Sequence, residues 1–83
     1  MSNVVSQQQL DHTLGIFERL DKGEISFEIL RDGINNHVAR VLAERRLINF
    51  KFTELATGRF IIRRTGTLAL TPFGQQRLAE IRG

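Results

Sequence analysis

The chain has 83 residues, the length of one domain with a small core, and its 41% hydrophobic and 25% charged residues are ordinary for a folded globular protein. It contains no cysteine, which excludes disulfides and thiolate metal sites, and no apolar run as long as a membrane-spanning helix. The first residues lack the basic, then apolar pattern of a signal peptide. We therefore expect a single domain over residues 1–83 in a reducing cytoplasm.

The charge is divided unevenly along the chain. Residues 1–33 contain three basic and six acidic side chains, whereas residues 34–83 contain nine basic and three acidic ones. Ten of the twelve basic residues are arginine, which can hold a phosphate or a guanine through two donors at once. An arginine-rich solvated surface is the simplest explanation, but the concentration of positive charge in one part of the chain favours a polyanionic partner.

A first helix is predicted over residues 7–21. Ser6 and Gln9 have the spacing of a capping box, in which each side chain satisfies a free backbone N–H. Apolar residues then recur at helical spacing, at Leu10, Leu14, Phe17 and Leu20. Gly23 is expected to end this helix, and Glu24–Ile25 has the length of a minimal strand.

Two helices joined by a turn are predicted over residues 26–46. Ser26 is a good N-cap for the first, Gly33 lies where it stops, and Asn35–Asn36 can cap the second. The second helix, over residues 36–46, has an apolar face formed by Ile34, Val38, Val41 and Leu42. Its opposite face is expected to carry Asn36, Arg40 and Ala43, flanked by His37, Ala39 and Glu44. In a helix-turn-helix, such a second helix can enter the DNA major groove.

A hairpin is predicted over residues 49–65, because the hydrophobic period changes there. Phe50 and Phe52 alternate with polar residues, which indicates a strand, and Gly58 permits a tight turn before the second strand.

A last helix is predicted over residues 72–82. Thr71 can cap it, and Pro72 suits its first position. Its expected buried residues are Phe73, Leu78 and Ile81, and Gly74 permits a close contact.

Three short segments resemble the winged helix-turn-helix of bacterial and phage transcription regulators. LAERRLI (residues 42–48) is similar to the end of the recognition helix in these families, where a glycine often stands in place of Arg46. LALTPFG (residues 68–74) looks like the Leu-Thr-x-x-Gly that follows the wing in MarR-type and PadR-type regulators, and ISFEIL (residues 25–30) fits the start of the helix-turn-helix. The resemblance implies an α+β winged helix: a three-helix core, a small antiparallel β-hairpin wing and a short C-terminal helix.

The candidate DNA-contacting residues form two groups. The group at the recognition helix is Asn35, Asn36, His37, Arg40 and Glu44. The group at the wing and backbone-facing surface is Arg46, Lys51, Thr57, Arg59, Arg63 and Arg64. Arginine pairs with guanine and asparagine with adenine, while wing arginines suit phosphates or a narrow minor groove. Successive strand residues face opposite ways, so Arg63 and Arg64 cannot both face the same groove.

The sequence gives little support for an enzymatic function. His12 and His37 lack metal-binding spacing, and the chain has neither a nucleophile elbow nor a glycine-rich phosphate loop. Phe50, Phe52 and Phe60 would suit a base-stacking platform, but a small domain needs such residues in its core.

We therefore expect a non-enzymatic, cofactor-free regulator that binds double-stranded DNA sequence-specifically as a homodimer. The main alternative is a winged helix that serves as a protein-interaction module for a protein partner, because fold does not fix function. Binding of RNA comes third.

Overall fold

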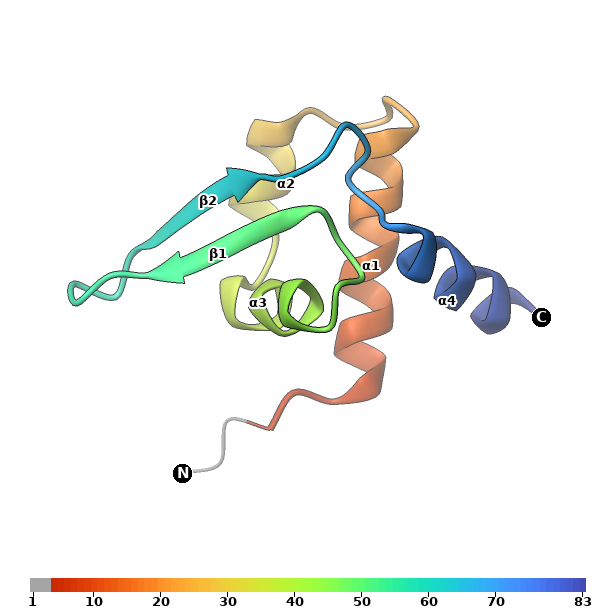
Figure 1. Cartoon of the computed structure of the whole chain (residues 1–83), viewed down its shortest axis with the longest axis horizontal. Helices are drawn as coiled ribbons and strands as arrows, with labels where there is room; N and C mark the ends of the chain where they lie inside the picture. Colours follow the sequence, from red (N-terminus) through yellow and green to blue (C-terminus); the bar gives the residue numbers. More distant parts are fainter. Residues whose placement is uncertain (1–3) are drawn as a thin grey trace.

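The computed structural model describes residues 4–83, which form an α+β fold of four helices and one β-hairpin (Figure 1). In chain order the elements are α1 (Gln7–Asp21), α2 (Phe27–Gly33), α3 (Asn36–Glu44), β1 (Phe50–Glu54), β2 (Phe60–Arg64) and α4 (Pro72–Arg82). The hairpin extends toward one end of the molecule's long axis, and α4 runs toward the other (Figure 1). The fold class predicted from the sequence is confirmed.

Each helix begins at the cap that its sequence predicts. Ser6 and Gln9 form a complete capping box at α1, and the Ser26 hydroxyl accepts a hydrogen bond from the Ile29 amide at 3.2 Å. Asn35 caps α3 and Thr71 caps α4, where Pro72 follows in the first position. These caps set the bounds of α1 and α4 at the predicted residues.

The end of α3 differs from the prediction, which extended this helix to Arg46. Its last residue is Glu44, and Arg46 has φ 61°, in the left-handed region that favours glycine. The Arg46 amide bonds to the Ala43 carbonyl at 3.1 Å and the Leu47 amide to the Leu42 carbonyl at 3.0 Å. This is a Schellman motif, with an arginine in the position usually taken by glycine.

The core lies where α1, α3 and the first strand meet. Its buried hydrophobic residues are Leu10, Leu14, Phe17, Leu30, Val38, Ala39, Leu42, Ile48, Phe50, Phe52, Ala69, Leu70 and Leu78. The Phe50 ring is central, with ring centroids 5.4 Å from Phe17 and 5.9 Å from Phe27. Phe50 and Phe52 therefore belong to the core, and the base-stacking interpretation of these two residues is wrong.

The sheet consists of β1 and β2 paired antiparallel, with Phe50 opposite Arg64 and Glu54 opposite Phe60. Gly58 has φ 85° in the turn between them. A single bridge from Ile48 to Leu70 joins the start of the hairpin to the segment before α4.

The minimal strand expected at Glu24–Ile25 does not form. The Glu24 amide bonds instead to the Arg19 carbonyl at 3.0 Å, so it closes the end of α1.

Helix α4 buries less of its surface than predicted. Leu78 is 5% exposed, but Phe73 is 62% and Ile81 43% exposed. Phe73 precedes Leu78 by five residues, or about 140° around the helix, so the two cannot share one face. Gly74 does make the expected close contact, because a Cβ added there would lie 2.1 Å from the Leu47 carbonyl oxygen.

Two arginine–carboxylate pairs hold α4 against α1. Arg77 donates to both oxygens of Asp11 at 3.2 and 3.1 Å, and Arg82 donates to both oxygens of Glu18 at 2.7 and 2.5 Å. The hydrogen bond from Arg77 lowers the pKa of the Asp11 carboxyl, and the one from Arg82 lowers the pKa of the Glu18 carboxyl.

Asp21, at the end of α1, makes a further connection to the C-terminal part. Its carboxylate accepts hydrogen bonds from the backbone amides of Ala69 and Leu70 at 2.5 and 2.9 Å. Within residues 4–83, every helix is too short or too polar to cross a membrane.

Candidate nucleic-acid interface

The basic side chains divide sharply by whether they have an acidic partner. Six lie within ion-pair distance of a carboxylate: Arg19, Lys22, Arg31, Arg40, Arg77 and Arg82. Within the described residues, the other six make no such pair, and all are exposed: Arg45, Arg46, Lys51, Arg59, Arg63 and Arg64. They come from the segment between the end of α3 and the end of β2, whose only acidic residue is Glu54. We call these six residues the basic segment.

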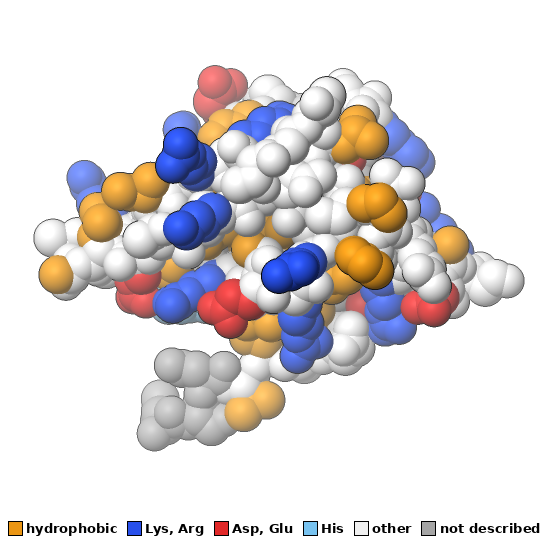
Figure 2. All heavy atoms as spheres, in the orientation of Figure 1, with side chains coloured by type: hydrophobic (Ala, Val, Ile, Leu, Met, Phe, Trp, Pro, Cys, Tyr) orange, Lys and Arg blue, Asp and Glu red, His pale blue; other side chains and the backbone are white. Residues whose placement is uncertain are grey.

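The basic segment covers the hairpin and the adjoining end of α3. Lys51 and Arg63 lie opposite each other in the β1–β2 register, so both project from the hairpin face that points away from the core. Arg59 and Thr57 are exposed at the hairpin tip beside Gly58. Figure 2 shows Lys and Arg side chains distributed over the hairpin on the face turned to the viewer. Their charge is available to an external anion.

Arg64 has a different environment from its neighbour Arg63, as the alternation of strand residues predicts. Its guanidinium donates to the carbonyl oxygens of Gly66 and Thr67 at 2.9 and 2.6 Å and lies 5.5 Å from the centre of the Phe50 ring. Arg64 therefore stabilises the turn after β2, and it shares the hairpin face that packs on the domain.

The face of α3 turned away from the core carries His37, Arg40 and Glu44, all exposed. Ala39, expected beside this face, is instead fully buried. The expectation was wrong because α3 packs against both α1 and β1, which centres its buried side on Val38, Ala39 and Leu42.

The two asparagines at the start of α3 are less available than predicted. Asn35 uses its side-chain oxygen to accept hydrogen bonds from the His37 and Val38 amides at 2.9 and 3.4 Å. Asn36 is partly buried, and its side-chain oxygen is inaccessible and without a hydrogen-bond partner among the described residues. Asn36 is thus not the outward-facing residue that the helical wheel suggested.

Two contacts join the exposed face of α3 to the hairpin. The His37 and Phe60 rings are nearly perpendicular, at 89°, with centroids 5.2 Å apart. Arg40 lies 3.2 Å from a carboxylate oxygen of Glu44 and 3.3 Å from one of Glu54, at the end of β1. A shallow groove of about 310 Å³ runs beside Arg40, between α3 and β1.

Glu54 and Arg45 are the residues of this surface that the sequence analysis did not assign to it. A signal for Glu54 was present, because a strand period of two places it on the same face as Phe50 and Phe52. Arg45 is the C-cap residue of α3, and the early end of this helix leaves it beside Arg46 in the connection to β1.

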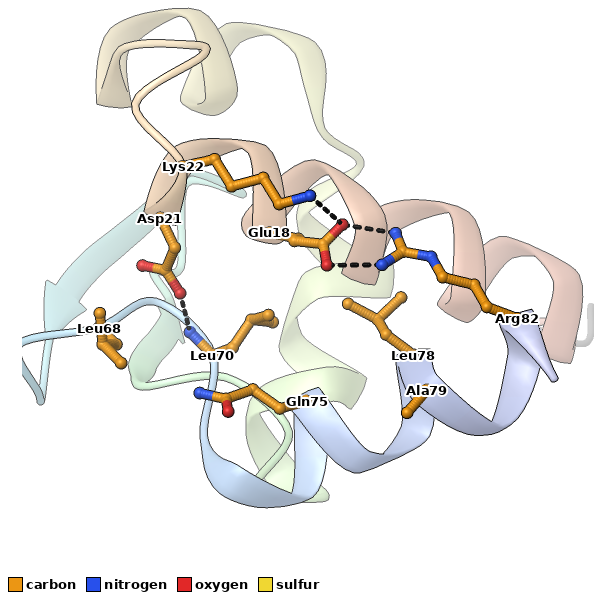
Figure 3. A pocket seen from close by; sticks show the side chains of 9 residues that line it. All are labelled: Glu18, Asp21, Lys22, Leu68, Leu70, Gln75, Leu78, Ala79 and Arg82. Carbon is orange, nitrogen blue, oxygen red and sulfur yellow. Dashed lines mark hydrogen bonds and ion pairs between the residues drawn. The ribbon is translucent and has the colours of Figure 1, made fainter.

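A second hollow, of about 370 Å³, lies on another part of the molecule, between the end of α1 and α4 (Figure 3). Leu68, Leu70 and Leu78 supply its apolar lining, and the Glu18–Arg82 pair forms one side. Among residues 4–83, no group of three His, Asp or Glu side chains is placed to hold a metal ion.

The domain is thus an α+β unit in which three helices, an antiparallel hairpin and a C-terminal helix form an arrangement compatible with a winged helix. Comparison of the chain with protein-family models, with curated proteins and with solved structures finds no match in any of the three.

Proposed function

We propose that this domain binds double-stranded DNA in a sequence-specific manner. The observation that supports this most directly is the basic segment, whose six exposed cations have no carboxylate partner among residues 4–83, while the remaining basic residues are paired. A folded domain that keeps this charge unneutralised on one hairpin and one helix end suits a polyanion.

In this proposal the hairpin and α3 have different tasks. Lys51, Arg59 and Arg63 contact phosphates or the minor groove and supply most of the affinity. Arg40, on the exposed face of α3, reads a guanine in the major groove through two donors. The exposed face of α3 offers few other residues that could read bases, so a homodimer on a repeated site would supply the remaining sequence selectivity. The role that follows is a small bacterial or phage transcription regulator without a catalytic step.

The test is a titration of the purified protein with random and with selected duplexes over a range of salt concentrations. Arg59→Gln with Arg63→Gln removes two unpaired cations, and Arg19→Gln with Arg31→Gln removes two paired ones as a control. We expect the first double variant to lower the slope of log K against log salt by about 1.8, and the control to leave it nearly unchanged. A wild-type slope near zero would exclude the proposal.

A protein-interaction module is the second candidate, and one observation favours it. Leu68 is 49% exposed and lines the hollow between α1 and α4. Phe73 is 62% exposed and lines another hollow, between the start of α4 and the end of α3. This function predicts weak DNA binding that does not distinguish selected from random duplexes. The same titration therefore separates the two candidates.

A further inference from the structure

Arg40 is the one basic residue of α3, and it is held by carboxylates from two different elements. Glu44 is one helical turn further along α3, with its side chain 65% exposed, and Glu54 approaches from β1 with 38% exposed. Both oxygens lie near the guanidinium, at 3.2 and 3.3 Å. Two negative charges thus surround a single positive one on the surface that the proposed function turns toward DNA.

We propose that Glu54, acting with Glu44, is a specificity-determining residue that masks Arg40 from DNA phosphates until a base offers a better partner. The inference rests on the proposed DNA-binding function. In the free domain, the pair of carboxylates leaves the Arg40 site with no net attraction for a random phosphate, so nonspecific binding depends on the basic segment alone.

The masking is reversible because the ion pairs are solvent-exposed. Exposed pairs of this kind contribute little to folding, so exchanging them for another partner costs the domain little. A guanine edge and a phosphate can each accept two hydrogen bonds from the Arg40 guanidinium, but only the phosphate carries a negative charge that the two nearby carboxylates repel. The carboxylates therefore weaken the nonspecific complex more than the specific one.

Of the two carboxylates, Glu54 contributes more to the masking of Arg40, because it belongs to the hairpin and not to α3. Glu44 follows Arg40 by four residues on the same helix and moves with it. Glu54 is the last residue of β1, and its partner in the register, Phe60, contacts His37 on the same helix face. The Arg40–Glu54 pair thus links the hairpin to α3 on the surface that the proposed function turns toward DNA.

The experiment compares Glu54→Gln with the wild type on a scrambled duplex and on a duplex selected from a random library. We expect Glu54→Gln to bind the scrambled duplex more tightly. That gain should decline by an additional factor of about 3.5 between 50 and 200 mM salt, which corresponds to one extra phosphate contact. The selected duplex should change less, so the ratio of the two affinities falls by about threefold. Glu28→Gln, which removes an exposed carboxylate on α2, is the charge-matched control and should leave the ratio unchanged.

A direct readout follows the Nε–H signal of Arg40 by NMR. In the wild type it should shift on addition of the selected duplex but not of the scrambled one, and in Glu54→Gln it should shift with both. An equal increase of both affinities in Glu54→Gln, or a shift of the wild-type Arg40 signal with scrambled DNA, would overturn the proposal. Failure of the proposed function itself looks different, because then the wild type shows no salt-dependent binding to any duplex.

Discussion

The Thr71 hydroxyl donates a hydrogen bond to the backbone carbonyl of Arg46 at 2.6 Å. The Thr71 hydroxyl oxygen in turn accepts a hydrogen bond from the Gly74 amide at 3.1 Å. One side chain therefore caps α4 and satisfies the carbonyl of the residue that ends the Schellman motif of α3. Thr71 is 9% exposed, so water cannot readily replace either bond.

Replacing Thr71 by valine keeps its shape but removes both bonds. We expect the free energy of unfolding to fall by about 2–3 kcal/mol, the sum of a lost N-cap and a lost buried hydrogen bond. Urea denaturation measures this change. Thr71→Ser keeps the hydroxyl and should lose less than half as much; equal losses in the two variants would assign the effect to packing.

Gly74 and Gly15 form a matched pair of helical glycines. Gly74→Ala places a methyl group against the Leu47 backbone and should destabilise the domain by about 2 kcal/mol or more. At Gly15 the added methyl group would meet no described atom within 4 Å beyond the neighbouring backbone of α1, and Gly15→Ala should stabilise the domain by about 1 kcal/mol. Thermal unfolding of both variants is the measurement, and changes of the same sign would contradict the placement of α4 against residue 47.

Arg46→Gly relieves a left-handed backbone conformation and removes one cation. We expect the free energy of unfolding to rise by up to about 1 kcal/mol, while affinity for duplex DNA falls. Arg45→Gly is the control, because Arg45 has an ordinary φ of −85° and the same charge. It should lower both stability and DNA affinity. Destabilisation of the domain by Arg46→Gly would mean that its side chain contributes more than its backbone conformation costs.

Acid should loosen the contact between α1 and α4. The folded state lowers the pKa of Asp11 and Glu18, so it binds fewer protons there than the unfolded chain does. Their stabilisation is present above the ordinary carboxyl values of about 4 and is lost as the pH falls through the lowered values. Asp11→Asn should flatten the acid limb of the free energy of unfolding plotted against pH, which urea denaturation at several pH values measures.

Arg40→Ala and Arg59→Ala should affect DNA binding in different ways. Arg40→Ala should weaken binding to a selected duplex by about 1–3 kcal/mol and binding to scrambled DNA by less, with little effect on folding. Arg59→Ala, at the hairpin tip, should weaken both complexes equally and lower the salt slope by about 0.9. Titration of both variants on both duplexes tests this, and identical behaviour would mean that helix and hairpin share one role.

Short sequence patterns were sufficient to predict most of the fold. The capping pairs at Ser6 and Thr71 and the alternation at Phe50 and Phe52 are each formed by residues close together in sequence, and the structure confirms them. The end of α3 depended on a positive φ at Arg46, which the Schellman hydrogen bonds and packing of the following residues stabilise. Sequence alone does not show that an arginine will accept this conformation.

The surface of α3 was predicted only in part, for a geometric reason. Helical periodicity placed Arg40 and Glu44 correctly outside, but it misplaced Ala39 and Asn36, because α3 is covered from two sides. The pairing of Arg40 with Glu54 joins residues 14 positions apart through the fold of the hairpin. No local pattern predicts such a contact.

The bonds from Asp21 to the amides of Ala69 and Leu70 join residues 48 and 49 positions apart. At a synthesis rate of about 5–20 residues per second, Asp21 is made roughly 2–10 s before these partners. During that interval Leu70 and Leu78 cannot cover their part of the apolar face of α1, so that part stays exposed on the nascent chain even where α3 can already pack. The order of translation therefore opposes early closure of this core, and a ribosome-bound chain that stops at Thr67 should expose α1 to proteases or chaperones that the finished domain excludes.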